Sequence, residues 1–346
     1  MRSRTFPLLI LLGLLVLAGL AAVVVVSSGA LKLSIEELEE KYTTPDSKFA
    51  EVDGIRAHYM DQGSGPVVVL LHATLMNLRT WDHLAGALAT NYRVIRMDRL
   101  LSGLTGADPS KAYSVEREIE LMEGLLDELG VDKFSLVGTS SAGTLSFRYA
   151  AQHPERVTNL VLINSAGMPR TAATNPNRQR GTWFGRWVRK YYQSQGFWKE
   201  TLALNFFAPP GEAPDWLVEM VYDTSRKEGL LDQVMIYMRN FSSGDPEAVL
   251  AQVRAPTLVL WGMENVTVNH LEAEVFEHWL VNAPVTKKKY PDTGHYLYLE
   301  IPEVVAEDIK AFLAKSRQSS TAINPEQAQG ERLAEYPSFG VPVHGS

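Results

Sequence analysis

The sequence predicts an α/β fold in which a doubly wound, mostly parallel β-sheet carries helices on both of its faces. Apolar runs of strand length alternate with helix-period segments along most of the chain. These runs are apolar at nearly every position, as strands are when helices cover both faces of their sheet. With 346 residues, 45% of them hydrophobic, the chain can bury one large core and also carry an insertion.

The N-terminus predicts a membrane anchor. Arg2 and Arg4 precede a nearly unbroken apolar run over residues 6–26, and a helix needs about 20 apolar residues to cross a bilayer. We expect residues 1–30 to form a single transmembrane helix. Because basic residues precede it and an acidic run follows it, the soluble part should lie on the extracytoplasmic side. Ser28 and Ala30 also allow a cleavable signal peptide and hence a secreted protein.

A stalk and an edge hairpin should follow the anchor. Ser34 and Glu37 have the spacing of a capping box, which predicts a short helix in a stalk over residues 31–46. From residue 47 two short runs flank Asp53 and Gly54, a pair that accepts the positive φ angles of a tight turn. These runs should form an antiparallel edge of the sheet.

The remaining core should alternate strands with helices. Strands are predicted at 67–71, 92–97, 134–137, 160–163, 257–260 and 285–290. Helices are predicted at 81–89, 115–129, 144–151, 271–280 and 304–313. The alternation stops over residues 167–253, which predicts a helical cap inserted after the sixth strand. The core then comprises residues 47–166 and 254–315, and the polar tail 316–346 should be disordered or loosely packed.

The strongest chemical signal is a small-residue turn between a strand and a helix. Gly138-Thr139-Ser140-Ser141-Ala142 has the pattern of a nucleophile elbow, in which small residues let the strand and the helix approach closely. Counting from the strand end places Ser140 at the apex. The rival nucleophile, Ser141, should be the first residue of the helix.

Two further segments complete a candidate site. Gly294-His295 follows the last predicted strand, and a serine nucleophile needs an imidazole that accepts its proton and later returns it. Thr74 ends the segment Leu71-His72-Ala73-Thr74 after an apolar strand. The main-chain N–H groups of Thr74 and Ser141 are predicted to form an oxyanion hole.

Over residues 47–315 these motifs resemble the α/β-hydrolase superfamily, in its group with a helical cap. The resemblance also includes the segment 256–262 and Glu300-Ile301-Pro302. It implies a serine nucleophile, a cap over the pocket, no cofactor, and hydrolysis of esters or related acyl bonds. Relatives with an aspartate nucleophile, such as epoxide hydrolases and haloalkane dehalogenases, differ at the position of Ser140.

The sequence departs from that family at the triad acid. The family places a carboxylate two residues after a Trp-Gly-x segment, whereas Trp261-Gly262-Met263-Glu264-Asn265 has Asn265 there. Asn265 can orient His295 but cannot stabilise its charged form. Glu264 is the alternative acid and Asp292 is another carboxylate near His295 in the sequence. The position after the sixth strand is again an amide, Asn164.

Two loop positions also differ from the family. Ala73 and Leu101 stand where the family usually has glycine, so their side chains should reshape the oxyanion region. Residues 170–199 are basic and aromatic with no acidic residue, which predicts either contact with membrane lipid or aromatic packing over the pocket.

The sequence as a whole predicts a membrane-anchored serine hydrolase. The catalytic residues would be Ser140, His295 and Asn265, acting on a small, lipophilic ester or acyl substrate without a cofactor or a metal. A formal net charge of −7 opposes a nucleic-acid partner, and the absence of cysteine excludes thiolate catalysis. Lipase-like, carbon–carbon hydrolase and haloperoxidase-like activities are variants of this prediction. The alternative is a non-catalytic or strongly attenuated homologue that binds a small apolar ligand.

Overall fold

The computed structural model describes residues 30–168 and 192–321, together with positions 13, 14, 17, 19, 21, 24 and 25. Three parts of the chain lie outside this description. They are most of the predicted anchor, residues 169–191, which include most of the basic aromatic segment, and residues 322–346. Within the described part of the chain, no helix has the length and hydropathy needed to span a membrane.

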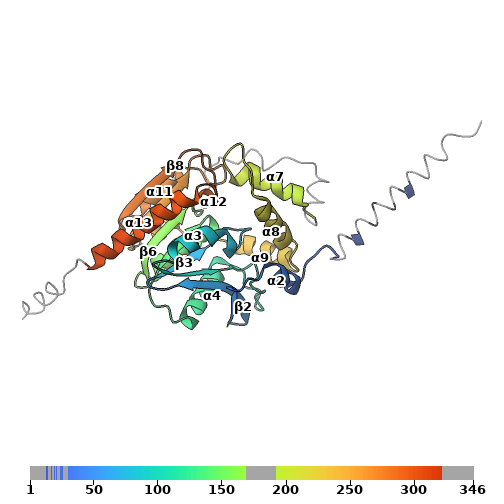
Figure 1. The fold of residues 1–346 in the computed structure, drawn as a ribbon, viewed down its shortest axis with the longest axis horizontal. Helices are drawn as coiled ribbons and strands as arrows, with labels where there is room; N and C mark the ends of the chain where they lie inside the picture. Colours follow the sequence, from blue (N-terminus) through green and yellow to red (C-terminus); the bar gives the residue numbers. More distant parts are fainter. Residues whose placement is uncertain are drawn as a thin grey trace, which may run out of the picture.

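An eight-stranded sheet forms the centre of the molecule, with strand order β1-β2-β4-β3-β5-β6-β7-β8 (Figure 1). The β1–β2 and β2–β4 pairs are antiparallel, and all other pairs are parallel. The predicted mostly parallel sheet is therefore confirmed, including its antiparallel edge. The strands are β1 (Lys48–Val52), β2 (Ile55–Gly63), β3 (Val67–Leu71), β4 (Arg93–Met97), β5 (Phe134–Thr139), β6 (Val157–Ile163), β7 (Thr257–Gly262) and β8 (Val285–Tyr290).

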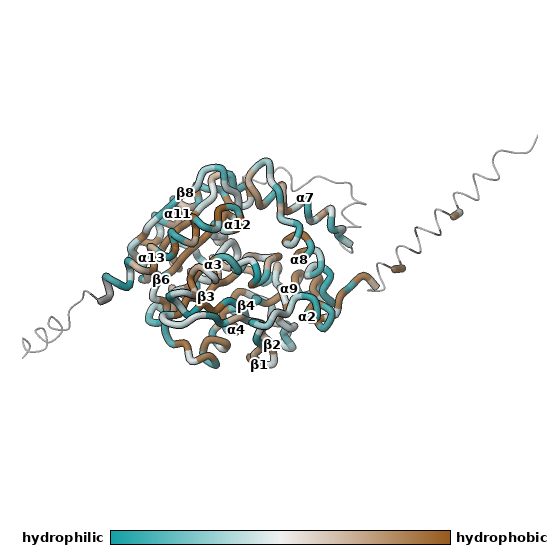
Figure 2. The backbone as a smooth tube through the Cα atoms, viewed as in Figure 1, coloured by the Kyte–Doolittle hydropathy of each residue, from teal (hydrophilic) through white to brown (hydrophobic). Residues whose placement is uncertain are grey.

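Helices cover both faces of this sheet. Val68 and Leu70 of β3 belong to one hydrophobic cluster, whereas Val69 and Leu71 belong to the other, as the two-residue period of a strand requires. The first cluster contains residues of α3 (Asp82–Leu88) and α13 (Pro302–Thr321), and the second contains residues of α4 (Val115–Glu128), α5 (Ser141–Gln152) and α11 (Glu272–Trp279). Figure 2 shows hydrophobic residues concentrated in the central strands and hydrophilic residues along the outside.

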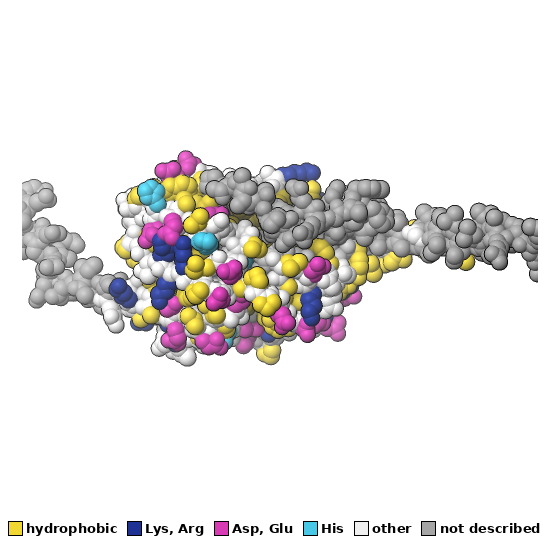
Figure 3. All heavy atoms as spheres, turned by 90° about the horizontal axis from the view of Figure 1, so that it is seen from above, with side chains coloured by type: hydrophobic (Ala, Val, Ile, Leu, Met, Phe, Trp, Pro, Cys, Tyr) yellow, Lys and Arg dark blue, Asp and Glu magenta, His cyan; other side chains and the backbone are white. Residues whose placement is uncertain are grey.

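Helices are inserted between β6 and β7, after the sixth strand as predicted. Figure 1 shows three of them as an arc beside the sheet, and we call these three helices the cap. They are α7 (Gln195–Phe206), α8 (Asp215–Ser225) and α9 (Leu230–Asn240), and α10 (Pro246–Leu250) follows them. On the face drawn in Figure 3, Lys and Arg side chains lie among Asp and Glu side chains.

The segment predicted as a stalk packs on the cap. Its helix α2 (Ile35–Tyr42) begins with the predicted capping box between Ser34 and Glu37. Lys41 pairs with Glu219 and Asp223 of α8 at 2.6 Å each, and Leu33 forms a parallel bridge with Lys227. The capping signal predicts the helix but not the surface on which it docks, so residues 31–42 form part of the folded body.

The helix α13 extends beyond the predicted end of the core. It continues to Thr321, so residues 316–321 of the predicted tail are helical. These residues carry little apolar pattern of their own, and a helix that is already nucleated propagates at low cost.

Candidate active site

Ser140 lies at a strained turn between β5 and α5. Its φ and ψ angles are 54° and −124°, a backbone conformation that is costly for a residue with a side chain. The neighbouring strand holds it there, because its N–H donates to Ile163 O at 3.1 Å and its carbonyl accepts from Ala166 N at 2.9 Å. Ser141 is the first residue of α5, as predicted.

Small residues make this turn possible. A Cβ atom on Gly138 would lie 2.2 Å from Ser146 Oγ and 2.6 Å from Ala142 O. A Cβ atom on Gly143 would lie 2.1 Å from Ser165 Oγ. The strand and the helix therefore approach as closely as a nucleophile elbow requires.

His295 lies in the loop between β8 and α12 (Leu297–Glu300) and is almost fully buried. Its Nδ1 lies 3.2 Å from Asn265 Oδ1, and its Nε2 has no hydrogen-bond partner among the described residues. Burial lowers the pKa of His295 to about 3, so the imidazole is neutral near pH 7. The cap lies against it, since Phe206 O accepts the N–H of His295 at 2.8 Å and the two rings lie 5.5 Å apart.

The contacts of Asn265 decide the tautomer of His295. Asn265 Oδ1 also accepts the main-chain N–H groups of Thr267 at 2.9 Å and Val268 at 3.1 Å. The atom facing His295 Nδ1 is therefore the amide oxygen, which can only accept. Nδ1 must carry the proton, and Nε2 keeps a lone pair that can accept a proton from a hydroxyl group.

No carboxylate among the described residues pairs with His295. The side chain of Glu264 is exposed, and its main-chain N–H donates to Thr293 O at 2.9 Å. The side chain of Asp292 is exposed as well. Of the three sequence-derived candidates, only Asn265 forms a hydrogen bond with the imidazole.

Asn164 serves a structural purpose beside this site. Its Nδ2 donates to Gly294 O at 3.1 Å and His295 O at 2.7 Å, while its Oδ1 accepts Gly262 N at 2.9 Å. The amide thus ties the end of β7 to the His295 loop. Because residues 163–166 also hold Ser140, one segment positions both candidate catalytic residues. No hydrogen bond joins Ser140 Oγ to His295 Nε2 in this state, and such bonds are often long without substrate.

The two residues predicted to form the oxyanion hole are in contact through their side chains. Thr74 Oγ1 and Ser141 Oγ are 2.7 Å apart, and neither main-chain N–H donates to another described residue. His72 supports the Thr74 arm: its Nδ1 bonds to Ala73 O at 2.8 Å and its Nε2 accepts Arg99 N at 3.1 Å. Burial lowers the pKa of His72 to about 4, which keeps this side chain neutral.

One of the two positions where the family usually has glycine adopts the backbone conformation that favours glycine. Leu101 adopts the left-handed conformation with φ 67°, whereas Ala73 does not, and Leu75 takes a φ of 71° instead. Leu101, Ala73 and Leu75 all line the cavity described below.

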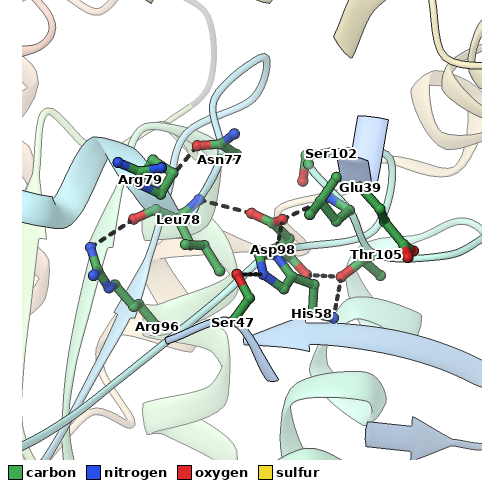
Figure 4. A network of polar contacts seen from close by, with 12 residues as sticks. Glu39, Ser47, His58, Asn77, Leu78, Arg79, Arg96, Asp98, Ser102 and Thr105 are labelled. Atoms are coloured by element: carbon green, nitrogen blue, oxygen red, sulfur yellow. Dashed lines mark hydrogen bonds and ion pairs between the residues drawn. The ribbon is translucent and has the colours of Figure 1, made fainter. Parts of the chain in front are cut away.

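Asp98 fixes the loops on both sides of this region (Figure 4). Its carboxylate accepts Leu78 N at 2.8 Å, Leu104 N at 2.7 Å and the His58 ring at 2.7 Å. Burial opposes its ionisation, but His58 and the main-chain donors hold the pKa of Asp98 at about 2. The carboxylate is buried with its donors satisfied, so it stabilises the loops and is not available to His295.

A cavity of about 690 Å³ lies between these loops and the cap. Thr74, Leu101 and Ser141 line it from the core, while Ser140 and His295 do not. The apolar wall from the cap and the N-terminal segment consists of Leu31, Val221, Leu230, Leu231, Val234, Met238 and Phe241. The part of the chain that the structure describes contains no cluster of acidic or histidine side chains suited to a metal ion.

Sequence reasoning named Glu300 only as part of a family motif, and it missed the role of this residue and the residues of a polar cluster around the site. Glu300 accepts Gly294 N and Ala208 N at 2.9 Å each and so joins the His295 loop to the cap. Arg99, Glu118 and Tyr237 form a buried polar cluster beside the cavity. Arg99 directly follows Asp98 at a strand end, and this position could have indicated a site residue. No local sequence pattern indicates Glu118 or Tyr237.

Comparison with known proteins gives consistent matches. A family model described as alpha/beta hydrolase fold matches residues 66–302. A cis-3-alkyl-4-alkyloxetan-2-one decarboxylase of Shewanella oneidensis is 24% identical over 80% of this chain and 91% of its own length. Epoxide hydrolase 3 of Xenopus tropicalis is 28% identical over 75% of each chain. A crystal structure described as a membrane phospholipase A superimposes with a TM-score of 0.64 at 24% identity, over 89% of this chain and 98% of the other.

Proposed function

Because the chain belongs to the α/β-hydrolase fold family, we propose that it is a serine hydrolase that cleaves carboxylic esters through an acyl-enzyme. The observation that carries the proposal is the tautomer of His295. Its Nδ1–H is held by an oxygen that can only accept, and this leaves Nε2 as a base in the region of a strained, elbow-borne Ser140.

The proposed reaction has two steps. In the first, Ser140 Oγ attacks the ester carbonyl carbon while its proton passes to His295 Nε2. The N–H groups of Thr74 and Ser141 bind the oxyanion, and its collapse expels the alcohol, which takes the proton from His295. In the second, water attacks the acyl carbon as it loses a proton to His295 Nε2. The acyl–Oγ bond then breaks, the acid leaves, and Ser140 Oγ takes the proton back from His295.

Asn265 makes this a slow enzyme. Proton transfer creates an imidazolium in a buried site, where the partner of Nδ1 among the described residues is a neutral amide. The same replacement of aspartate by asparagine in a serine protease costs roughly four orders of magnitude in turnover, mainly because it imposes the wrong imidazole tautomer. Asn265 keeps the correct tautomer here, so its cost is the missing charge beside the imidazolium. Slow acylation at Ser140 is therefore the expected kinetic signature.

The cavity reaches the proposed oxyanion hole at Thr74 and Ser141, although Ser140 and His295 do not line it, and it favours a lipophilic substrate. Its volume of about 690 Å³ is within the usual range for small-molecule sites, and its cap wall is apolar. The structural similarity to a protein described as a membrane phospholipase A supports an ester or lipid substrate. Carbon–carbon hydrolase and haloperoxidase-like activities use the same arrangement of residues and remain variants of the proposal.

The apolar N-terminal run is proposed to anchor the protein, with the folded body on the extracytoplasmic side. Leu31 and Lys32 line the cavity. Val26, the last residue of the run, is five residues from Leu31, a reach of at most roughly 18 Å. The cavity would therefore open close to the membrane surface. Retention of the full chain in carbonate-washed membranes and its digestion by external protease are the expected results, whereas a shortened chain in the medium indicates cleavage and secretion.

Covalent labelling tests the hydrolase proposal directly. A fluorophosphonate probe should label the full chain in detergent, and Ser140→Ala should abolish the labelling. Ser141→Ala keeps the nucleophile, so its labelling should be slower but present. Labelling that survives Ser140→Ala would reject Ser140 as the nucleophile.

The second candidate function is a non-catalytic binder of a small apolar ligand. The uncharged partner of His295 and the missing Ser140–His295 hydrogen bond favour it. Under this alternative the folded wild-type protein is not labelled, and native mass spectrometry of the purified protein shows a co-purified apolar molecule.

A further inference from the structure

Arg99 is a buried arginine beside the cavity that the proposed reaction does not use. Its side chain is 4% exposed. Nη1 donates to Ser141 Oγ at 2.9 Å and to His72 O at 3.0 Å. Nη2 donates to Glu118 Oε2 at 2.6 Å and lies 3.4 Å from Tyr237 OH. The guanidinium thus connects the core loops with helix α4 and with cap helix α9.

The contacts of the cluster offset part of the free-energy cost of burying its charges, since Arg99 Nε has no hydrogen-bond partner among the described residues. Burying a guanidinium is unfavourable unless an anion and further hydrogen bonds compensate it. Glu118 provides the anion, and Tyr237 OH donates to Glu118 Oε2 at 2.8 Å. Burial and the Glu118 carboxylate raise the pKa of Tyr237, so its hydroxyl stays protonated and can donate. A hydrophobic replacement of similar volume often gives equal stability, so stability alone does not account for the pair.

The contacts of Arg99 reach both arms of the proposed oxyanion hole. On one arm its main-chain N–H donates to His72 Nε2 at 3.1 Å and its Nη1 donates to His72 O, two residues before Thr74. On the other arm Nη1 donates to Ser141 Oγ. The contact between Thr74 Oγ1 and Ser141 Oγ closes the ring. One planar group therefore sets the spacing between the loop after β3 and the first residue of α5.

We propose that Arg99 is a positioning residue of the oxyanion hole, acting through Ser141 Oγ and His72 O, and that Tyr237 makes this positioning depend on the cap. The inference rests on the proposed function. Main-chain donors stabilise an oxyanion only where they are held at hydrogen-bond distance from its position in the transition state. A lysine cannot replace the guanidinium, because an ammonium lacks the planar fork that spans two acceptors.

The kinetic test removes the ion pair without leaving a single buried charge. Arg99→Gln/Glu118→Gln should lower kcat for p-nitrophenyl butyrate roughly 10- to 100-fold, less than the full loss of one oxyanion donor, with little change in KM. Tyr237→Phe should lower kcat by a smaller factor. Because Arg99 acts through Ser141 Oγ, adding Ser141→Ala to the double variant should cost much less than it costs in the wild type.

Arg96→Gln is the matched control. Arg96 is also a buried arginine, but it lies in β4, pairs with Asp82 and Gln62 and does not line the cavity. Its replacement should leave kcat unchanged. An equal loss of kcat in both variants, additive costs of the Ser141 change, or a rise in KM alone would overturn the positioning role.

Hydrogen exchange provides a readout that does not depend on turnover. Met76 N–H donates to Ala73 O at 3.1 Å on one arm, and Gly143 N–H donates to Ser140 O at 2.9 Å on the other. Both amides should exchange faster in Arg99→Gln/Glu118→Gln than in Arg96→Gln. Faster exchange in a protein that fluorophosphonate never labels supports the positioning inference and rejects the hydrolase. Unchanged exchange with unchanged kcat rejects the inference and leaves the hydrolase intact.

Discussion

Replacing Asn265 by aspartate puts a negative charge next to His295 without changing the shape of the side chain. The Oδ1 contacts with Thr267 N and Val268 N are kept, and these donors favour the ionised carboxylate. At the observed 3.2 Å to His295 Nδ1 and an effective dielectric constant of about 20, the attraction to an imidazolium is at most roughly 5 kcal/mol.

This attraction is absent while His295 is neutral and appears as it accepts the proton of Ser140. It therefore lowers the acylation barrier, and 5 kcal/mol corresponds to somewhat under four powers of ten in rate. The desolvation cost of the new buried charge reduces this gain in acylation rate. We expect Asn265→Asp to raise the acylation rate by about two to four orders of magnitude.

The assay is the second-order rate of fluorophosphonate labelling, together with kcat for p-nitrophenyl butyrate. Asn164→Asp is the control, because it makes the same chemical change in a neighbouring buried amide. There the carboxylate loses the two bonds that Nδ2 donates to the His295 loop, so the rate should fall. A folded Asn265→Asp protein whose rate rises less than about threefold would refute His295 as the base, because the electrostatic gain expected from this geometry is far larger.

Three further predictions follow from the same contacts. Because the neutral imidazole is the base and its pKa is about 3, kcat/KM of the wild type should stay constant down to about pH 4. In Asn265→Asp the pKa of His295 rises, so the fall of kcat/KM at acid pH should move toward neutral pH. A fall of kcat/KM near pH 6.5 in the wild type would contradict the burial argument. Gly138→Ala should destabilise the protein by about 1–3 kcal/mol in denaturant unfolding, because its Cβ would lie 2.2 Å from a side-chain oxygen of α5, whereas Gly86→Ala, with nothing within 4 Å, should not destabilise it. Burial lowers the pKa of Lys227 to about 8, so between about pH 8 and 10 the unfolded chain binds more protons than the folded chain. The free energy of unfolding should therefore rise with pH in this range. The rise should disappear in Lys227→Met, and its persistence in that variant would assign it to another group.

Local patterns carried most of the fold prediction. Apolar runs and helix periods predicted the strands and the insertion after the sixth strand, because both depend on neighbours within a few residues. The elbow was equally accessible, since Gly138 and Ala142 must be small wherever a strand turns sharply into a helix. The docking of residues 31–42 on the cap was not, because Lys41 and Asp223 are 182 residues apart.

The sequence by itself determined the doubly wound sheet, the apex position of Ser140 and the uncharged side chain at position 265. Only the tertiary structure decided what those residues can do. The tautomer of His295 follows from two main-chain donors that fix the amide of Asn265. Asn164 donates hydrogen bonds that hold the His295 loop, and Arg99 forms a hydrogen bond with Tyr237, which is 138 residues away in the sequence. Strand and turn preferences act over short stretches of chain, whereas the pairing of buried polar groups depends on which distant segments the packed core brings into contact.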